Sequence, residues 1–174
     1  KNVVIPENCE KLLFEDGILY GENEDGTRTL VYCRANFEAA SYTIPSNVSK
    51  IASNAFMHAK KIGKIVFEQS DVPLTIDASA FKNSSITEIE IPARLESMGT
   101  GVFQSCTKLA KVTFENGYKY ATIPTNTFNA SGLTAVQIPD CVTEIGVSAF
   151  SGCKSLKTVG LGENSALLTI NNYA

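Results

Sequence analysis

Apolar residues return along this chain at a fixed interval of 47 residues. The pair Ile-Pro begins at positions 44, 91 and 138, and phenylalanine keeps the same interval at positions 56, 103 and 150. Several independent columns in one register predict a repeat protein, because chance does not hold that many positions in phase. Two further columns share the interval: Ile76, Ile123 and Ile170, and Ile62, Leu109 and Leu156.

Each 47-residue unit divides into two unequal halves. Successive phenylalanines from Phe56 to Phe150 are separated by 25, 22, 25 and 22 residues. Each half contains a six-residue string with apolar residues at its first, fourth and sixth positions. The last four residues of a string alternate, as in a short β-strand with one buried face. The five strings begin at Ile62, Ile86, Leu109, Leu133 and Leu156.

A solenoid explains this pattern. One coil of 22 to 25 residues cannot bury its own apolar edge, but stacked coils bury it against their neighbours. We expect parallel strands hydrogen-bonded from coil to coil, and a short helical turn on the opposite side at segments such as Asn54-Ala55-Phe56. An ordinary β-sandwich does not account for the constant register. Shorter halves end their string in Ile-Pro and longer ones insert residues after Phe67 or Phe114, so the long loops belong on one rim.

Composition narrows the function classes. The chain has 174 residues, 44% of them apolar, which suits one folded domain. A net charge of -3 argues against a nucleic-acid groove, and no apolar run reaches the ~20 residues that span a bilayer. Five cysteines without a C-x-x-C pair favour reduced structural thiols over a disulfide framework or a zinc site.

The sequence contains no recognisable catalytic constellation. His58 is the only histidine, and its place two residues after Phe56 favours a solvated polar residue over a general base. Neither a nucleophile motif nor a phosphate-binding glycine loop occurs. Residues 21–26 lack the first and twelfth ligands of a calcium loop and favour a polar hairpin tip. We therefore expect no enzyme, no cofactor and no metal.

Several cysteines and asparagines have more than one interpretation. Cys106 and Cys153 share a repeat position two coils apart, too far for a disulfide, and are interpreted as small buried turn residues. A bridge between Cys9 and Cys33 is conceivable. Three asparagines fit the glycosylation pattern and are interpreted as inert turn residues: Asn47, Asn83 and Asn129.

The outward positions of the predicted strands form two columns. A solvated face, whose charges keep the protein soluble, is the first interpretation. The second is a concave mixed-charge surface that binds a macromolecule, as solenoids commonly do, with lysine and glutamate pairing between neighbouring strands. Tyr20 and Tyr32 would add aromatic contacts or pack in the core. The candidate partner-facing residues are Lys64, Val66, Glu88, Glu90, Lys111, Thr113 and Gln137.

The cadence I-P-x-x-V-x-x-I-x-x-x-A-F-x-x-C-x-x-L, which residues 138–156 match, resembles the BspA-like, or Treponema pallidum-type, leucine-rich repeat. The resemblance implies a leucine-rich-repeat solenoid, a right-handed β/α superhelix with parallel strands. Residues 16–20, 29–32 and 42–45 resemble the family's N-terminal β-hairpin insertion. The resemblance also implies a secreted or cell-surface protein that binds proteins or glycoproteins, including extracellular matrix. A structural spacer that presents another domain is the alternative, and we expect a monomer.

The chain departs from the family pattern at a few positions. Gly101-Val102 and Asn126-Thr127 replace Ser-Ala before their phenylalanines. The ninth repeat position lacks an unbroken asparagine ladder, so its turn hydrogen bonds must be met differently in alternate coils. This position reads Asn8, Asn47, Ser70, Arg94, Gly117, Cys141 and Asn164.

The domain boundaries follow from the repeat. We expect one leucine-rich-repeat domain over 1–174, with an incomplete first repeat and its hairpin at 1–43 and regular repeats at 44–174. Both ends cut the repeat in mid-phase and Lys1 is not an initiator. We therefore expect a fragment of a longer array, since solenoids end in polar caps.

Overall fold

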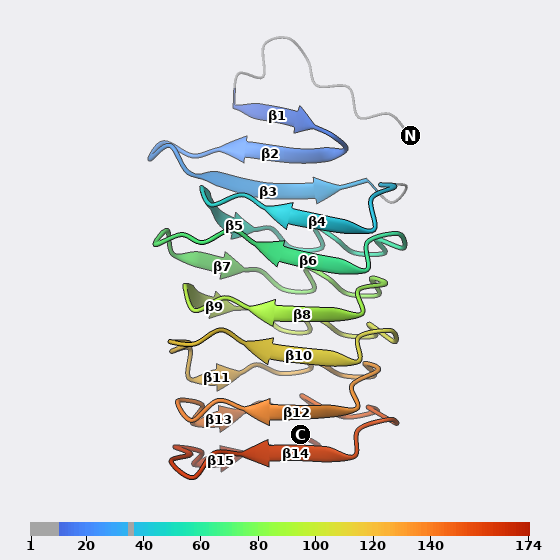
Figure 1. Ribbon diagram of the computed structural model, residues 1–174, viewed down its shortest axis with the longest axis vertical. Helices are drawn as coiled ribbons and strands as arrows, with labels where there is room; N and C mark the ends of the chain where they lie inside the picture. The colour runs from blue at the N-terminus through green and yellow to red at the C-terminus, as the bar shows by residue number, and fades with distance from the viewer. Residues whose placement is uncertain (1–10, 35–36) are drawn as a thin grey trace.

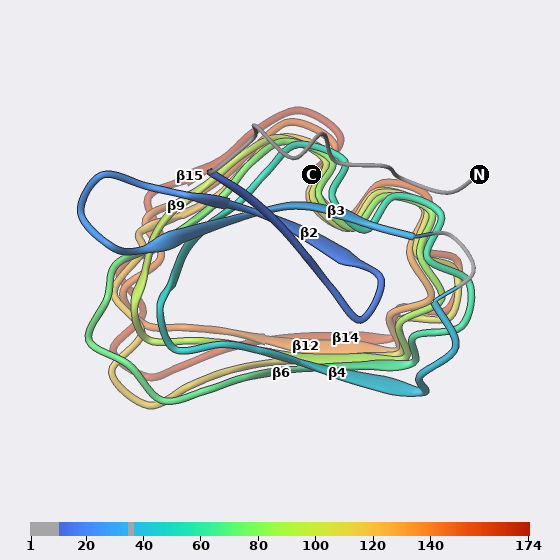
Figure 2. The same cartoon turned by 90° about the horizontal axis from the view of Figure 1, so that it is seen from above.

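A computed structural model describes residues 11–34 and 37–174. The chain winds into a stack of flattened coils, and each regular coil contributes one strand to either side (Figures 1 and 2). The strands on the first side form one six-stranded parallel sheet, called sheet B. In chain order they are β4 (Ser41–Ile44), β6 (Lys64–Phe67), β8 (Glu88–Ile91), β10 (Lys111–Phe114), β12 (Ala135–Ile138) and β14 (Thr158–Leu161).

The opposite side of the stack carries two further sheets. Sheet A has the order β1-β2-β3-β5-β7-β9, and sheet C has the order β11-β13-β15. Figure 2, which looks down the stack, shows these strands across the coil from sheet B. Sheet A comprises β1 (Leu12–Glu15), β2 (Ile18–Glu22), β3 (Arg28–Cys33), β5 (Val48–Ile51), β7 (Leu74–Ile76) and β9 (Leu95–Met98). Sheet C comprises β11 (Thr122–Ile123), β13 (Glu144–Ile145) and β15 (Thr169–Ile170).

The parallel strands predicted from the six-residue strings are confirmed. Strands β6, β8, β10, β12 and β14 coincide with the last four residues of the five strings, and neighbours pair in register, for example Val112 with Ile89. Along β12 the residues alternate between exposed and buried, so Val136 and Ile138 face the core. The apolar periodicity therefore sets both the position of each strand and the face that it buries.

The phenylalanines form a continuous stack through the core. Phe56, Phe81, Phe103, Phe128 and Phe150 lie one above the next with ring centroids 4.9 to 5.5 Å apart. The first four are almost completely buried. Such an aromatic ladder makes each coil's core depend on both of its neighbours.

The predicted helical turn around each phenylalanine is wrong, because the described residues contain no helix. Asn54 and His58 have positive φ, and the N–H groups of Asn54 and Phe56 donate to the carbonyls of Ala78 and Ala80 in the next coil (3.3 and 2.7 Å). An α-helix keeps these N–H groups for its own carbonyls. The segment is instead a run of tight turns joined by a ladder between coils, which also contradicts the β/α form of the fold.

Left-handed backbone in these turns explains the departures from the repeat pattern. The position two residues before each phenylalanine has positive φ in every coil, and it is occupied by residues that tolerate this conformation. Gly101 and Asn126 therefore serve there as well as serine does. The full set is Asn54, Ser79, Gly101, Asn126 and Ser148.

The N-terminal strands continue sheet A in an antiparallel arrangement. β1 pairs with β2 and β2 with β3, and β3 then runs parallel to β5. Residues 42–44, which the resemblance assigns to a hairpin insertion, lie instead in β4, the first strand of sheet B. The predicted extent of the hairpin insertion is therefore wrong at residues 42–44, because these residues already follow the geometry of the regular coils.

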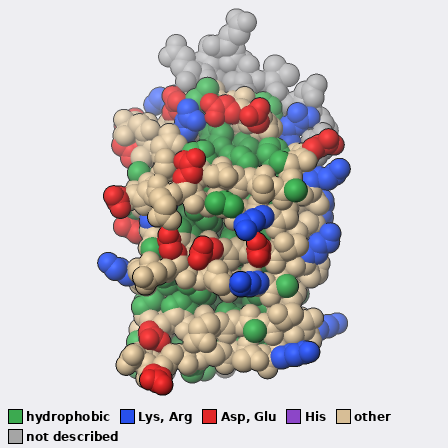
Figure 3. Space-filling view, in the orientation of Figure 1, with side chains coloured by type: hydrophobic (Ala, Val, Ile, Leu, Met, Phe, Trp, Pro, Cys, Tyr) green, Lys and Arg blue, Asp and Glu red, His purple; other side chains and the backbone are tan. Residues whose placement is uncertain are grey.

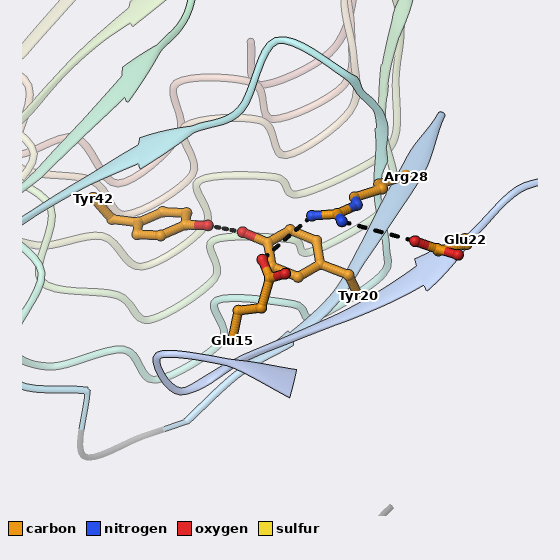
Figure 4. A network of polar contacts seen from close by, with 5 residues as sticks. All are labelled: Glu15, Tyr20, Glu22, Arg28 and Tyr42. Atoms are coloured by element: carbon orange, nitrogen blue, oxygen red, sulfur yellow. Dashed lines mark hydrogen bonds and ion pairs between the residues drawn. The ribbon is translucent and has the colours of Figure 1, made fainter. Parts of the chain in front are cut away.

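A polar network closes the N-terminal end of the core (Figure 4). The hydroxyl groups of Tyr20 and Tyr42 hydrogen-bond to one another, and the Arg28 guanidinium lies 5.6 Å from the centroid of the Tyr20 ring. Arg28 also pairs with Glu15 (3.3 Å) and Glu22 (3.7 Å). Burial raises the pKa of Tyr20 to about 12. Tyr20 therefore belongs to the core, whereas Tyr32 is exposed.

Candidate binding surface

The outward face of sheet B brings all seven candidate residues together. Lys64, Glu88 and Lys111 occupy one column on β6, β8 and β10, as the strand register requires. The Lys64 Nζ lies 2.8 Å from the Glu88 Oε1. The second column contains Val66, Glu90, Thr113 and, on β12, Gln137. Acidic and basic side chains lie next to each other across the middle of this face (Figure 3).

The contact between Lys64 and Glu88 shifts the pKa of both side chains. The hydrogen bond from Lys64 holds the pKa of the Glu88 carboxyl below its ordinary value, and the Lys111 charge adds to this effect. The same hydrogen bond raises the pKa of Lys64. The predicted pairing across the strand ladder is therefore confirmed at β6 and β8. Because both side chains are about half exposed, the pair contributes little to stability.

The charge is confined to the central strands. The outward positions of β12 and β14 carry Ala135, Gln137, Thr158 and Gly160, none of which is charged. A partner that recognises charge on this face would therefore contact β6, β8 and β10 rather than the whole length of the sheet.

A groove of about 470 Å³ lies on the same three strands, beside the loops that follow them. The loops after β6 and β10 span residues 68–73 and 115–121, whereas the loop after β8 spans only residues 92–94. The short loop thus lies between two longer loops, and the amide of Gln69 reaches across it to the Glu115 carboxylate (2.6 Å). The predicted placement of the long loops on one rim is confirmed.

Carboxylates of the long loops cap the short ones. Glu68 accepts a hydrogen bond from the N–H of Ser46, and Glu115 accepts one from the N–H of Ala93, each at 2.8 Å. Both donors follow the proline of an Ile-Pro pair. The Ala93 N–H, followed by the Gln69 amide, lowers the pKa of the Glu115 carboxyl. These contacts hold the rim in place without a regular strand.

The ninth repeat position satisfies its turns in different ways, as the broken asparagine ladder predicts. The Arg94 Nη1 donates to the carbonyls of Val48 and Val72 (2.9 Å each). The Cys141 Sγ instead donates to the carbonyl of Tyr118 (3.3 Å). Burial lowers the pKa of Arg94, and its Nε and Nη2 atoms have no hydrogen-bond acceptor among the described residues.

The histidine and the described cysteines, which are the residues considered for catalysis or disulfide formation, lie in turns or in the core. His58 is exposed in a turn. The Cys106 and Cys153 thiols donate to the carbonyls of Phe81 and Phe128 (3.0 Å each), and burial raises the pKa of Cys106. Cys106 is the small buried turn residue that was predicted, whereas Cys153 is only partly buried. Cys33 is buried, and Cys9 lies outside the described residues.

The acidic residues 21–26 comprise the end of β2 and most of the turn, residues 23–27, that joins β2 to β3. Its Asp25 carboxylate accepts hydrogen bonds from the backbone and hydroxyl groups of Thr27 (2.9 and 2.7 Å). Within residues 11–34 and 37–174, no three His, Cys, Asp or Glu side chains gather in a way that could hold a metal ion. In the same part of the chain, no helix has the length and apolarity to cross a membrane.

Sequence reasoning missed Gln69, Arg94 and Glu115 as residues that shape this surface. A signal for the capping carboxylates was present, because a glutamate directly follows the strands that end at Phe67 and Phe114. The contact between Gln69 and Glu115 joins residues 46 positions apart. It depends on loop heights that no local pattern encodes.

A family model described as the BspA type leucine rich repeat region matches residues 31–157 and 121–174, with six copies. The chain belongs to this family. Comparison with curated proteins finds no match.

Solved structures share the fold of this BspA-type repeat protein. A leucine-rich repeat protein from Eubacterium ventriosum is 21% identical with a TM-score of 0.80, over 97% of this chain and 50% of that one. The pneumococcal vaccine antigen PcpA is 24% identical with a TM-score of 0.68, over 88% of this chain and 50% of that one. The Treponema pallidum leucine-rich repeat protein is 19% identical with a TM-score of 0.59, over 92% and 86% of the two chains. This chain thus spans about half the length of the first two.

Proposed function

We propose that this chain is a non-catalytic protein-binding module of a cell-surface or secreted protein, and that the outward face of sheet B holds the binding site. The observation that carries the proposal is the concentration of charge on β6, β8 and β10 beside a groove, on an otherwise weakly charged sheet. Membership of the BspA-type family and the likeness to a pneumococcal antigen support the surface location.

We further propose that the ligand is a host or extracellular-matrix glycoprotein, bound by the monomer. A rigid stack of coils presents a fixed array of side chains, which suits recognition of a large partner. Lys64, Glu88, Glu90 and Lys111 provide the charged contacts, while Val66, Thr113 and Gln137 provide uncharged ones.

Surface plasmon resonance over fibronectin, fibrinogen, collagen and laminin tests this function. We expect saturable binding of the wild-type chain to at least one of them, and loss of that binding in the double variant Lys64→Glu/Lys111→Glu. The double variant Lys108→Glu/Lys154→Glu makes the same change of charge at exposed positions away from this face, in the turns that follow Phe103 and Phe150. This variant should bind normally. Equal losses in both double variants, or no binding by the wild type, would contradict the proposal.

A spacer that presents another domain is the second candidate. The stacked phenylalanines and the ladder between coils favour it, since both make the solenoid stiff along its axis. A spacer would tolerate charge reversal at Lys64, Glu88 and Lys111 without loss of function.

We also propose that these residues are a segment of a longer array, with an incomplete first repeat at 1–43 and regular repeats at 44–174. Val159, Leu161 and Ile170 support this, because they are exposed by 49, 52 and 65% although their counterparts Val136, Ile138 and Ile145 are buried. A further coil would cover them. We expect the intact mass of the protein from its own cells to exceed 18.7 kDa, and a native protein ending at Ala174 would overturn this proposal.

A further inference from the structure

Positive charge gathers in the turns around the stacked phenylalanines, where the chain passes from sheets A and C into sheet B. These five turns carry six lysines and a single carboxylate, that of Asp77. They lie on the right in Figure 1, where the strands of sheet B begin, and basic side chains follow the same edge in Figure 3. The turns span residues 52–63, 77–87, 99–110, 124–134 and 146–157. The six lysines, called the lysine stripe, are Lys60, Lys61, Lys82, Lys108, Lys154 and Lys157.

The opposite rim of the solenoid has the opposite sign. The segments that lead from each strand of sheet B to the next strand in the chain carry five carboxylates but only two cations, Arg94 and Lys119. The net charge of -3 therefore conceals a separation of charge across the molecule. The five carboxylates belong to Glu68, Asp71, Glu115, Asp140 and Glu163.

The protein neutralises little of the charge on the lysine stripe. Lys61 pairs with Glu38, at 3.9 Å and with both side chains exposed. Asp77 pairs with Lys50 of β5 (3.0 Å), which is not a member of the stripe. In residues 11–34 and 37–174, the other five lysines of the stripe form no ion pair. All of the stripe except Lys82 is exposed, so these charges are accessible to a partner.

The lysine stripe is elongated along the axis of the stack. Its members come from the coils of Phe56, Phe81, Phe103 and Phe150, whereas the coil of Phe128 contributes none. The rings in successive coils lie 4.9 to 5.5 Å apart, so the stripe extends over four such steps. A row of cations of this length suits a linear polymer with repeated anionic groups rather than a single small ion.

The type of cation indicates the type of anion. Lysine acts as a compact point charge that suits sulfate or phosphate oxygens, whereas arginine favours bidentate binding of carboxylates. The five turns contain lysine and no arginine. Exposed hydroxyl groups lie among the lysines and can hydrogen-bond to a sugar. They belong to Ser53, Thr107 and Ser155.

Two other phosphate-bearing or acidic partners fit these turns less well. Single-stranded nucleic acid binds through exposed aromatic rings that stack on its bases, but the phenylalanines of the turns face the core. A membrane surface is held by apolar side chains as well as by basic ones. Val147, exposed by 41%, is the only large apolar residue of the five turns that is exposed.

We propose that the lysine stripe binds a linear sulfated polysaccharide, which lies along the axis of the solenoid with its sulfate groups paired to the lysines. This site is separate from the outward face of sheet B and goes beyond the proposed function. Only the choice of a polysaccharide as the source of the sulfate groups rests on the proposed cell-surface or secreted location.

Fluorescence anisotropy with labelled heparin oligosaccharides, as the sulfated probe, tests this proposal on the intact chain. The test variant is Lys108→Glu/Lys154→Glu, and Lys108→Gln/Lys154→Gln removes the same charges without reversing them. The control Lys11→Glu/Lys119→Glu makes the same change of net charge at exposed positions outside the stripe. Competition with hyaluronan, which carries carboxylates but no sulfate, with duplex DNA and with phosphatidylserine vesicles compares the sources of negative charge. Circular dichroism confirms that each variant is folded.

We expect saturable heparin binding that weakens as the salt concentration rises. The affinity should fall about tenfold or more in Lys108→Glu/Lys154→Glu, less in the glutamine variant, and only slightly in the control. Hyaluronan, DNA and vesicles should compete more weakly than unlabelled heparin. No heparin binding, equal losses in the test and control variants, or stronger competition by any of the other three would overturn the proposal.

The result is independent of the proposed function, because the two sites are read by different variants. Matrix glycoprotein binding without heparin binding would overturn only the lysine stripe. Heparin binding without glycoprotein binding would overturn only the site on sheet B.

Discussion

The two rims of the solenoid follow different rules. On the phenylalanine rim, formed by the turns around Phe56, Phe81, Phe103, Phe128 and Phe150, every coil repeats the same backbone conformation and the same stacked ring. The loop rim is formed by the segments that lead from each strand of sheet B to the next strand in the chain, such as residues 68–73, 92–94 and 115–121. On this rim, the loop length and the group that caps the loop change from coil to coil.

This difference separates stability from recognition. The phenylalanine rim buries aromatic surface and links coils through backbone hydrogen bonds, so a change there affects each neighbouring coil. The loop rim satisfies its polar groups locally with side chains such as Glu115 and Arg94, so it can vary without loss of the stack. We therefore expect substitutions on the first rim to lower stability and substitutions beside the second to change binding.

Truncation of a central phenylalanine should have the largest effect on stability. Phe103→Ala removes a fully buried ring that stacks on Phe81 and Phe128, which should lower the free energy of unfolding by about 3–5 kcal/mol. Urea unfolding followed by circular dichroism measures this change. Phe150→Ala is the matched variant, and it should cost less because Phe150 is only partly buried and stacks on Phe128 alone. Equal losses in both variants would contradict the stacking account.

Filling the close approach at Gly99 should have the next largest effect. A Cβ atom there would lie 2.4 Å from the backbone nitrogen of Ala78 in the preceding coil, so the two coils must move apart. We expect Gly99→Ala to lower the free energy of unfolding by about 1–3 kcal/mol. At Gly63 the nearest atom is the Ala40 carbonyl oxygen at 3.5 Å. Gly63→Ala should therefore unfold at nearly the wild-type urea concentration, and a midpoint as low as that of Gly99→Ala would refute the close-contact argument.

The buried thiols offer a smaller and more local test. Cys106→Ala removes the hydrogen bond to the Phe81 carbonyl and leaves a small cavity, which should cost about 1–2 kcal/mol in thermal unfolding. Cys153 makes the same bond to the Phe128 carbonyl but is only half-buried. A loss in Cys153→Ala that matches or exceeds the loss in Cys106→Ala would show that burial does not control this position.

The smallest effect is expected on the loop rim, at Glu115. Hydrogen bonds in the folded protein lower the pKa of this carboxyl, so its ionised form stabilises the fold above the unfolded value of 4.5. We expect Glu115→Gln to cost less than about 1 kcal/mol at pH 7. The difference from wild type should vanish as the pH falls through the lowered pKa. Denaturant midpoints measured as the pH is lowered from 7 test this, and a difference that does not shrink as the pH falls would contradict the assignment.

Much of the fold follows from the sequence, because a solenoid repeats its apolar columns at the interval of its coils. Five of the six strands of sheet B were predicted from alternation within six-residue strings, whereas the residues of β4 were assigned to the hairpin insertion. On the opposite side, the short strands of the regular coils were not predicted, since segments such as Leu74–Ile76 are too short to show a period. The helical turn was a wrong interpretation of Ala-Phe pairs. The Asn, Ser or Gly two residues before each phenylalanine was the signal for left-handed backbone.

The candidate surface was only partly predictable. The outward columns at Lys64 and Val66 follow from strand alternation, and the structure places them as expected. The groove arises from a difference in loop length between adjacent coils and from the contact of Gln69 with Glu115. Neither the groove nor this contact leaves a periodic pattern in the sequence, so both could be recognised only from the three-dimensional structure.

The most direct test of the separation between the two rims measures stability and binding on the same preparations. The free energy of unfolding and the affinity for the four matrix glycoproteins are determined for wild type, Phe150→Ala and Lys64→Glu/Lys111→Glu. We predict that Phe150→Ala lowers stability while the protein still binds at a temperature where it is folded. The charge-reversed variant should lose binding at nearly wild-type stability. Loss of binding that follows stability across all three proteins would contradict a binding site on the outward face of sheet B.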